Sequence, residues 1–451
     1  MSFNRRSFIR YASLAAAGHV AGLRPFGAMN GLAESAADYK ALVCIFFYGG
    51  NDSNNLLVPF DSSNSDVTGY ANYARIRGPL ALPKSSLLQL GPDPSYALHP
   101  SLPQIRSLFN SGNVALIANV GTLIQPLSRA QYMEGQGQTP TNLFSHPDQQ
   151  QEWQNATQTA TSPTGWAGRI ADKLTSTYNP GSQIPLVTSA FGDSIFCNGA
   201  TTSPVAVQPG NVQGGACSEG AACAGRLATA QHLLSFSSGL SLVQADNQIT
   251  GDAYKYMNIL GDAVRSVAPL QTDFPANNGL AAQLRQIAQI IQVRQALGVR
   301  RQIFFAGLGN FDTHANQLGI QSGLLSLVGP AMSAFYEATK ELGVADSVTS
   351  FTMSDFSRAL QPNSNDGSDH AWGGHHMIMG GAVKGGRIYG TYPTLALNGP
   401  SDIDGNGRWL PTTASTQYAA TLASWFGVPA ADMPVIFPSI NSFATKHLGF
   451  V

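Results

Sequence analysis

The sequence predicts an α/β fold in which a doubly wound, mostly parallel sheet lies between layers of helices. The first observation is a set of continuous apolar runs bounded by glycine, of which residues 41–48 and 113–120 are the clearest. Such runs are typical of strands buried on both faces, as in parallel sheets covered by helices. The second observation is that amphipathic helical patterns, over residues 279–297 and 324–342, alternate with strands. This alternation indicates a parallel sheet with helical crossovers.

The third observation is an aspartate shortly after each of three predicted strands. The strands cover residues 41–48, 301–309 and 348–353, and the aspartates are Asp52, Asp312 and Asp355. In open α/β sheets, ligands bind at the carboxyl ends of the strands, so these aspartates are candidate site residues. Asp52 also fits a structural role as a helix N-cap or in an Asx turn.

Length and composition bound the organisation of the chain. Its 451 residues are 43% hydrophobic and include 47 glycines and 26 prolines, which is typical of a loop-rich globular protein. We predict one large domain over residues 38–451, with a loop-rich insertion around residues 190–250. The formal net charge is −1, and we find no basic stretch interleaved with aromatic residues, so we expect no nucleic-acid partner.

Residues 1–37 have the features of an export signal. Arg5 and Arg6 precede Phe8 and a short apolar run over residues 11–23, which is the pattern of a twin-arginine signal peptide. The apolar run is too short to span a bilayer. We therefore expect the twin-arginine translocase to export the protein to the periplasm or the exterior, with no transmembrane segment in the mature chain.

The four cysteines are compatible with an oxidising compartment. Cys44 lies in an apolar run and is predicted to be a buried small hydrophobic residue. Cys197, Cys217 and Cys223 lie in the loop-rich stretch, where one disulfide is permitted. Cys217 with Cys223 is the shortest pairing, and Cys197 with either of them is the alternative.

Residue types that bind metals are concentrated in two segments. Residues 310–317 and 354–376 hold four of the nine histidines, in a chain with only 11% charged residues. Carboxylate oxygens and neutral imidazoles are the ligands of zinc and similar divalent ions. The candidate ligands are Asp52, Asp312, His314, Asp355, His370, His375 and His376. Two adjacent pairs occur here, Asp369 with His370 and His375 with His376. Adjacent residues rarely bind one ion together, so we expect one member of each pair to be a ligand and the other to support it.

Two interpretations of these ligands stay open. One or two ions could bind, and two ions a few ångströms apart could hold the attacking and leaving oxygens of a phosphoryl or sulfuryl transfer. Alternatively, the aspartates and histidines pair among themselves and only fix loops. Arg358 is a candidate clamp for a tetrahedral oxyanion. Its structural alternative is a salt bridge to Asp355 or Asp369.

Four motifs and the leader resemble a known family. The motifs are GGNDSNNLLVP, NFDTHANQ, SDFSR and DHAWGGHHMIMGGAVKGGRIYG. Together they resemble the bacterial domain-of-unknown-function family 1501, from about Tyr39 to the last residues. That family resembles a distant member of the alkaline phosphatase/sulfatase superfamily. The resemblance implies an alkaline phosphatase/sulfatase-like α/β fold with a metal-centred, ester-hydrolysing site.

The resemblance assigns roles to the first two strand ends. Asp52 matches the superfamily aspartate after the first strand. Asp312 with His314 resembles the Asp/His pair of one metal, although the usual spacing would put the histidine at Asn316. This departure puts a complete two-metal site in doubt.

The resemblance also assigns roles near the third strand end. Asp355 resembles the later metal aspartate, but Phe356 stands where a histidine normally follows it. His375 or His376 resembles the final histidine ligand.

The superfamily nucleophile lies at a helix start after the second strand and has no clear counterpart here. Ser145, with His146 beside it, is the first candidate, and Thr122 is the second. A nucleophile needs a base or a metal for activation. The alternative role of Ser145 is a plain N-cap of the helix predicted near residues 145–153.

These patterns lead to two hypotheses of different classes. The first is an exported metal-dependent hydrolase of phosphate or sulfate esters that holds zinc, manganese or calcium. The second is a periplasmic or surface protein that keeps the hydrolase fold and binds a carbohydrate or protein partner without turnover. A redox enzyme is disfavoured, because the sequence has no flavin, nicotinamide or haem motif.

Overall fold

The computed structural model describes residues 38–451 except 62–68, 158–160, 210–220 and 237–238. The predicted leader over residues 1–37 and Cys217 lie outside the described residues. Within them, Cys44 and Cys197 are buried free thiols, so the structure gives Cys197 no disulfide partner.

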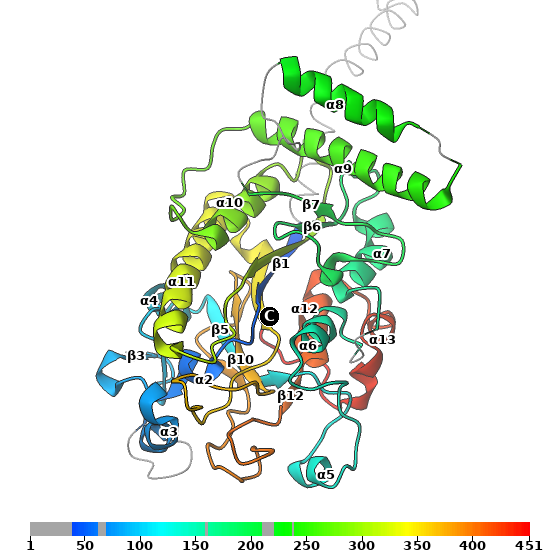
Figure 1. The fold of residues 1–451 in the computed structure, drawn as a ribbon. Coiled ribbons are helices and arrows are strands. Elements are labelled where there is room, and N and C mark those ends of the chain that lie inside the picture. The colour runs from blue at the N-terminus through cyan, green and yellow to red at the C-terminus, as the bar shows by residue number, and fades with distance from the viewer. Residues whose placement is uncertain (1–37, 62–68, 158–160, 210–220, 237–238) are drawn as a thin grey trace, which may run out of the picture.

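A mixed sheet of nine strands forms the centre of the described chain (Figure 1). Eight strands lie in the order β11 (Ile388–Gly390), β5 (Val114–Gly121), β10 (Gly374–Met379), β9 (Val348–Ser354), β1 (Lys40–Phe47), β8 (Arg301–Leu308), β6 (Val187–Ser189) and β7 (Val205–Ala206). The ninth, β12 (Thr413–Ala414), pairs with β5.

The sheet is mostly parallel, as predicted. Only β10 runs antiparallel, to both of its neighbours. The strands predicted over residues 41–48, 113–120, 301–309 and 348–353 correspond closely to β1, β5, β8 and β9. Phe47 is in register with Leu308 of β8 and Ser354 of β9, so three strands end at the same edge of the sheet. This alignment brings the polar segments after β8 and β9 together.

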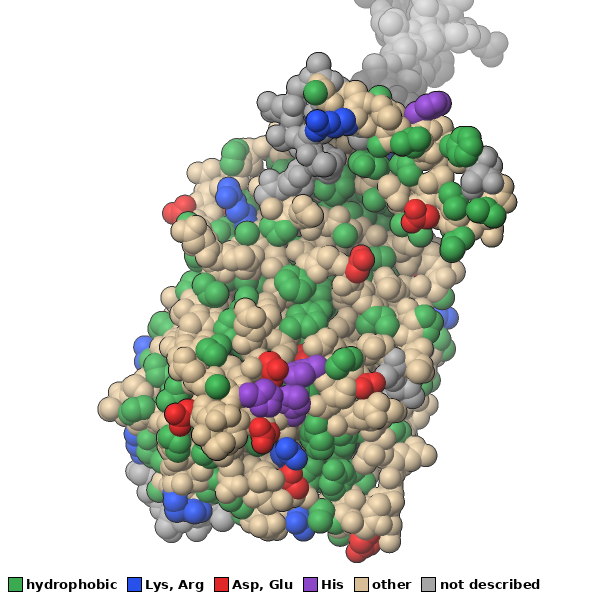
Figure 2. All heavy atoms as spheres, in the orientation of Figure 1, with side chains coloured by type: hydrophobic (Ala, Val, Ile, Leu, Met, Phe, Trp, Pro, Cys, Tyr) green, Lys and Arg blue, Asp and Glu red, His purple; other side chains and the backbone are tan. Residues whose placement is uncertain are grey.

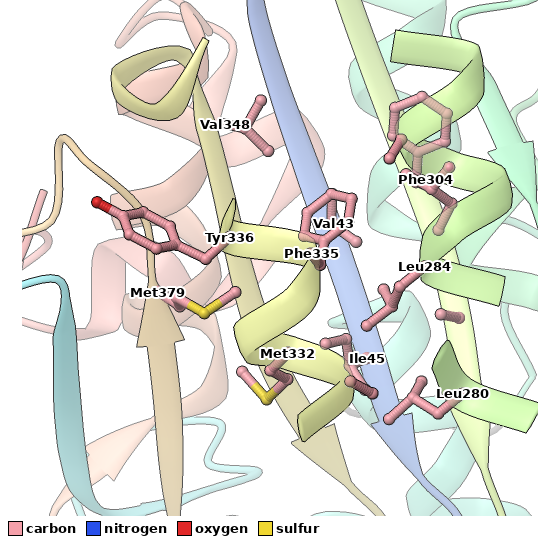
Figure 3. Packing of buried hydrophobic residues seen from close by; sticks show 14 of the residues in the cluster. Val43, Ile45, Leu280, Leu284, Phe304, Met332, Phe335, Tyr336, Val348 and Met379 are labelled. Carbon is pink, nitrogen blue, oxygen red and sulfur yellow. The ribbon is translucent and has the colours of Figure 1, made fainter. Parts of the chain in front are cut away.

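Helices cover both faces of the main sheet. Successive side chains of β1 point to opposite faces, so this strand contributes to the packing on each side. Val43 and Ile45 face one layer, which contains α4 (Pro103–Asn110), α10 (Gly279–Gln292) and α11 (Gln317–Glu341). Figure 3 shows Val43 and Ile45 beside Leu284 of α10 and Met332 of α11. Leu42, Cys44 and Phe46 face the other layer, which includes α6 (His146–Asn155), α7 (Trp166–Tyr178), α12 (Ser415–Phe426) and α13 (Met433–Ile436).

The helix α11 is long and apolar enough to span a membrane by length and composition, and half of its apolar window is buried. Its side chains Leu325, Val328 and Met332 lie in the same hydrophobic cluster as β1. We therefore interpret α11 as a core helix of the α/β domain.

The expected loop-rich insertion around residues 190–250 is less irregular than its composition suggests. It contains α8 (Ala221–Leu234) and the start of α9 (Ser241–Arg265). Alanine, leucine and glutamine are good helix formers, which outweighs the glycine and serine in this stretch.

The remaining elements lie around the main sheet. A small sheet contains β2 (Leu57–Pro59), β4 (Tyr96–Leu98) and β3 (Leu88–Gln89). The other helices are α2 (Ser53–Leu56), α3 (Tyr70–Arg77) and α5 (Arg129–Met133). Short 3₁₀ turns are η1 (Gly78–Leu80), η2 (Lys84–Ser86), η3 (Ile195–Cys197), η4 (Ala345–Ser347) and η5 (Pro438–Ser442).

Candidate metal centre

Four side chains converge at the edge where β8 and β9 end. Asp312 and His314 follow β8, His146 is the first residue of α6, and His370 lies in the loop before β10. We call these four residues the open cluster. Figure 2 shows histidine side chains gathered with acidic side chains on one face of the molecule. The side chains of Asp312 and His314 are 46% and 44% exposed, so solvent reaches the cluster.

The imidazoles of the open cluster present the same atom to its centre. Nε2 of His370 lies 3.1 Å from Nε2 of His146 and 2.9 Å from Nε2 of His314. All three Nε2 atoms lie 3.0–3.4 Å from Oδ1 of Asp312. In a tetrahedral zinc site with zinc–nitrogen distances of about 2.0–2.1 Å, two ligand atoms lie about 3.3 Å apart. The spacing of these atoms therefore suits one small divalent ion.

The opposite nitrogen of each ring faces an oxygen atom. Nδ1 of His146 lies 2.6 Å from Oδ2 of Asp355, and Nδ1 of His370 lies 2.7 Å from the carbonyl oxygen of Phe144. Nδ1 of His314 lies 3.4 Å from a carboxylate oxygen of Asp369. Metal-binding histidines typically donate their other N–H to a carboxylate or a carbonyl, which fixes the tautomer.

These contacts determine where the lone pairs lie. A carbonyl oxygen only accepts hydrogen bonds, so Nδ1 of His370 carries the hydrogen and Nε2 of the neutral ring carries a lone pair. The carboxylate of Asp355 has the same effect on His146. Asp355 is held in place because its two oxygens also accept from the Gly49 amide and from Gln150 Nε2. Two lone pairs 3.1 Å apart repel unless a proton or a metal ion lies between them. The residues present therefore fit a divalent metal ion when both rings are neutral.

Arg358 holds the carboxylate of the cluster. Its guanidinium pairs with Oδ1 of Asp312. Burial alone would raise the pKa of Asp312, but the hydrogen bond and charge of Arg358, with the nearby histidines, lower it to about 2. Asp312 is therefore ionised at all physiological pH values.

The histidines differ in how easily they gain a proton. Burial lowers the pKa of His146, but the hydrogen bond and charge of Asp355 and the charge of Asp312 raise it overall. Burial and the charge of Arg358 lower the pKa of His370. A neutral His370 is ready to bind a metal, since metal ions bind the deprotonated nitrogen.

Arg358 is committed to structural contacts. Its side chain is fully buried and donates to the carbonyl oxygens of Gly49, Gly50 and Ser368 as well as to Asp312. Nη1 also lies 3.4 Å from Nε2 of His314. The predicted alternative partners, Asp355 and Asp369, are not the ones that the structure pairs with Arg358. With its donors engaged, Arg358 positions Asp312 and is not arranged to clamp a substrate oxyanion.

Three predicted ligands lie in other surroundings, and we call Asp52, His375 and His376 the buried set. They are 1%, 2% and 5% exposed. Asp52 caps α2 by accepting from the Asn54 amide, and it forms a fully buried ion pair with Arg77. These contacts match the structural role that the sequence left open for Asp52.

The two histidines of the buried set point to opposite faces of β10, as neighbours in a strand do. His375 stacks on Tyr392, and its Nδ1 accepts from the Asn119 amide. His376 packs against Trp153 and Tyr418. Burial lowers the pKa of each histidine to about 3, so both rings are neutral.

The candidate nucleophiles are engaged with other side chains. Ser145 lies at the N-cap of α6 beside His146, but its hydroxyl donates to Asp148 instead of capping the helix. Thr122 is buried and donates to Gln149. His146, predicted as a catalytic partner of Ser145, instead directs its ring towards Asp355 and His370.

Gln150 and the carbonyl of Phe144 also support the cluster, and neither is among the site residues predicted from the sequence. Gln150 lies four residues after His146 on α6, so the two share a helix face, and this spacing could have indicated it. A backbone carbonyl leaves no signal in the side-chain pattern. Phe356 packs against the rings of His146 and His370, so this residue fills space beside the cluster.

The fold and the site together define a mostly parallel α/β protein with an Asp/His centre at the strand ends. A family model described as "Protein of unknown function (DUF1501)" matches residues 39–404, so the chain belongs to this family. The resemblance seen in the motifs is thereby confirmed. No significant match was found among curated proteins.

Solved structures with similar chains have low identity. Ps i-CgsB in complex with k-i-k-neocarrahexaose is 10% identical, with 90% of this chain and 77% of that chain covered and a TM-score of 0.35. The lipoteichoic acid synthase LtaP from Listeria monocytogenes is 8% identical, with 88% and 74% covered and a TM-score of 0.34. A 2-O GAG sulfatase is 11% identical, with 89% and 74% covered and a TM-score of 0.31. Similarity this low transfers neither activity nor residue roles.

Proposed function

We propose that this protein is an exported metal-dependent hydrolase of phosphate or sulfate esters. The single observation that carries the proposal is the convergence of imidazole Nε2 lone pairs on Asp312. The donor atoms of His146, Asp312 and His370 all lie within 4.8 Å of one another, and we take these three residues as the ligands. His314 is the less favoured ligand, because Arg358 Nη1 lies 3.4 Å from its Nε2.

The site holds one ion in this proposal. A second ion in a two-metal arrangement would need further free carboxylates. Asp52 is already neutralised by Arg77, and Arg358 supplies positive charge on the other side of Asp312. Both carboxylates are thus already paired with an arginine, which leaves little negative charge for a second cation.

The residues of the chain then have distinct tasks. When bound, the ion supplies Lewis-acid polarisation of the ester and of an attacking water. Asp355 and the Phe144 carbonyl orient His146 and His370, and Arg358 keeps Asp312 ionised. Solvent exposure of Asp312 and His314 leaves the centre open on one side, where a substrate can approach. Neither Ser145 nor Thr122 is required as a nucleophile in this scheme.

The substrate class and the export route rest on sequence. The four motifs resemble a family similar to the alkaline phosphatase/sulfatase superfamily, which supports phosphate or sulfate esters as substrates. The paired arginines and short apolar run of residues 1–37 support twin-arginine export.

A second candidate function is a binding protein that holds the ion without turnover. The engaged hydroxyls of Ser145 and Thr122 favour it, because no hydroxyl among these candidates is free to attack. The committed donors of Arg358 favour it too, since this guanidinium is not arranged to stabilise a developing oxyanion.

The test is metal content and turnover of the full chain. Elemental analysis should find one equivalent of zinc, manganese or calcium in the wild-type protein and none in an Asp312→Ala/His370→Ala variant. Asp262→Ala/His447→Ala is the matched control, because it replaces an exposed aspartate and an exposed histidine far along the chain from the cluster. Wild-type protein should hydrolyse an aryl phosphate or an aryl sulfate, and the cluster variant should not.

The outcomes separate the two candidates. An ion without turnover in the wild type supports the binding protein. A folded wild-type protein that takes up no ion, even when incubated with each metal, overturns both metal-based proposals.

A further inference from the structure

Exposed apolar side chains are concentrated on the hairpin formed by α8 and α9. Among the described residues, ten large hydrophobic side chains are exposed, and six of them lie between residues 233 and 249. These six form the tip patch: Leu233, Phe236, Leu240, Leu242, Val243 and Ile249. Leu242 is 82% exposed and Phe236 is 70% exposed. Such a concentration of exposed apolar area usually marks an interaction surface.

The hairpin carries this patch away from the body of the protein. Figure 1 shows α8 and α9, both green, at one end of the molecule beyond the central sheet. The second half of α9 anchors the hairpin, because Met257 and Leu260 are buried in the main hydrophobic cluster. The first half of α9 is largely exposed. The tip can therefore reach a flat surface before the body of the protein touches it.

The tip carries almost no charge. The sequence has no lysine or arginine between residues 227 and 254, and Asp246 and Asp252 are its only acidic residues there. A strongly charged partner would find no complementary group. The affinity of the tip must come from burying apolar side chains.

The patch is too small for a stable protein interface. Specific interfaces involve about 20–30 residues on each side. The six apolar side chains lie in the last turn of α8, the connection between the helices and the first nine residues of α9. Towards the body, Asp252 and Lys255 interrupt the apolar surface of α9, and the exposed side chains of α8 include Arg226 and Gln231. A second copy of this chain would need a longer apolar stripe.

We propose that the hairpin tip inserts into the interfacial region of a lipid bilayer. A few exposed leucine and phenylalanine side chains on a protruding element suit the boundary between headgroups and acyl chains. Because the tip lacks basic residues, it binds zwitterionic lipid and does not depend on anionic headgroups. This attachment is independent of the metal centre, which lies lower on the face shown in Figure 2.

The test is flotation of the full chain with phosphatidylcholine vesicles. Wild-type protein should float with the vesicles, and Phe236→Ser/Leu240→Ser/Leu242→Ser should reduce the bound fraction at least tenfold. Met133→Ser/Ile320→Ser/Val435→Ser is the matched control, because it removes three exposed apolar side chains elsewhere and should float like the wild type. Raising salt from about 0.1 M to about 1 M, which shortens the Debye length from about 10 Å to about 3 Å, should leave binding unchanged.

A second variant tests insertion directly. In Phe236→Trp, the fluorescence of the new tryptophan should shift to the blue when phosphatidylcholine vesicles are added. The proposal is overturned if the wild type stays in solution, if the triple hairpin variant floats as well as the wild type, or if binding requires anionic lipid. A dimer in light scattering that the triple hairpin variant abolishes, without flotation of the wild type, would make a second copy the occupant and would also overturn it.

Discussion

The open cluster and the buried set contain the same residue types, yet their surroundings give them opposite properties. In the open cluster, Asp312 is half exposed and three imidazoles turn their Nε2 atoms towards it. In the buried set, Asp52 is enclosed with Arg77, and His375 and His376 are packed among aromatic rings. Aspartates and histidines near strand ends can thus form either an open candidate metal site or part of the buried interior. The difference depends on whether lone pairs converge or are already engaged.

The largest expected effect is on stability and concerns Asp52 of the buried set. Arg77→Met leaves the carboxylate of Asp52 buried without its counterion, so the free energy of unfolding should fall by about 3–5 kcal/mol. Denaturant unfolding of the full chain measures this loss. Arg75→Met is the control, because Arg75 is exposed and should change stability by less than about 0.5 kcal/mol. Equal stability of the two variants would contradict a structural role for the Asp52–Arg77 pair.

The sheet could be predicted from sequence because its strands are buried on both faces. β1, β5, β8 and β9 are almost continuous runs of apolar residues, and few other structures accommodate such runs. β10 was missed because it begins Gly374, His375 and His376, which indicated ligands and not a strand. Aromatic rings from other elements pack against both histidines, and this tertiary contact cannot be seen in the local sequence.

The site could be predicted only in part, for a related reason. Asp312, His314, Asp355 and His370 were found because they follow predicted strands or lie in a histidine-rich motif. His146 was noticed only as a neighbour of Ser145, since 166 residues separate it from Asp312 in the chain. Sequence adjacency also suggested that His375 and His376 belong with His370. Successive side chains of a strand point to opposite faces of the sheet. His375 and His376 of β10 therefore lie in different surroundings from each other, and neither joins His370 in the open cluster.

An intermediate effect concerns the pH dependence of the buried set. The pKa of His376 is about 3 in the folded protein and near its ordinary value of 6.5 when unfolded. The unfolded chain therefore binds a proton that the folded chain excludes, and stability falls as pH drops below 6.5. One such group contributes a slope of about 1.4 kcal/mol per pH unit. Between pH 6 and pH 4, the wild type should lose roughly 2–3 kcal/mol more than His376→Leu.

Urea unfolding at the two pH values measures this difference. His447→Leu replaces an exposed histidine and should keep the pH dependence of the wild type. If His376→Leu loses as much stability on acidification as the wild type, the ring of His376 is not held neutral by burial.

The smallest expected effect is on the metal affinity of the open cluster. Asp355→Asn keeps the shape of the side chain but removes the charge that orients His146 through Nδ1. Loss of such a supporting carboxylate typically weakens metal binding 10–100-fold, so the zinc affinity of Asp355→Asn should fall by about that factor. Competition with a chromophoric chelator measures the affinity. Folding should persist, since the amide oxygen of asparagine can still accept from the Gly49 amide.

Asp369→Asn is measured beside Asp355→Asn, because it tests whether His314 is a ligand. Asp369 is 55% exposed and lies 3.4 Å from Nδ1 of His314, so it would support the ion only if His314 were a ligand. Because the proposal assigns the ion to His146, His370 and Asp312, Asp369→Asn should change the affinity far less than Asp355→Asn. Equal losses in both variants would add His314 to the ligands. Unchanged affinity in Asp355→Asn would remove His146 from them, and the ion would then have to be held on the Arg358 side of Asp312, where a guanidinium already lies.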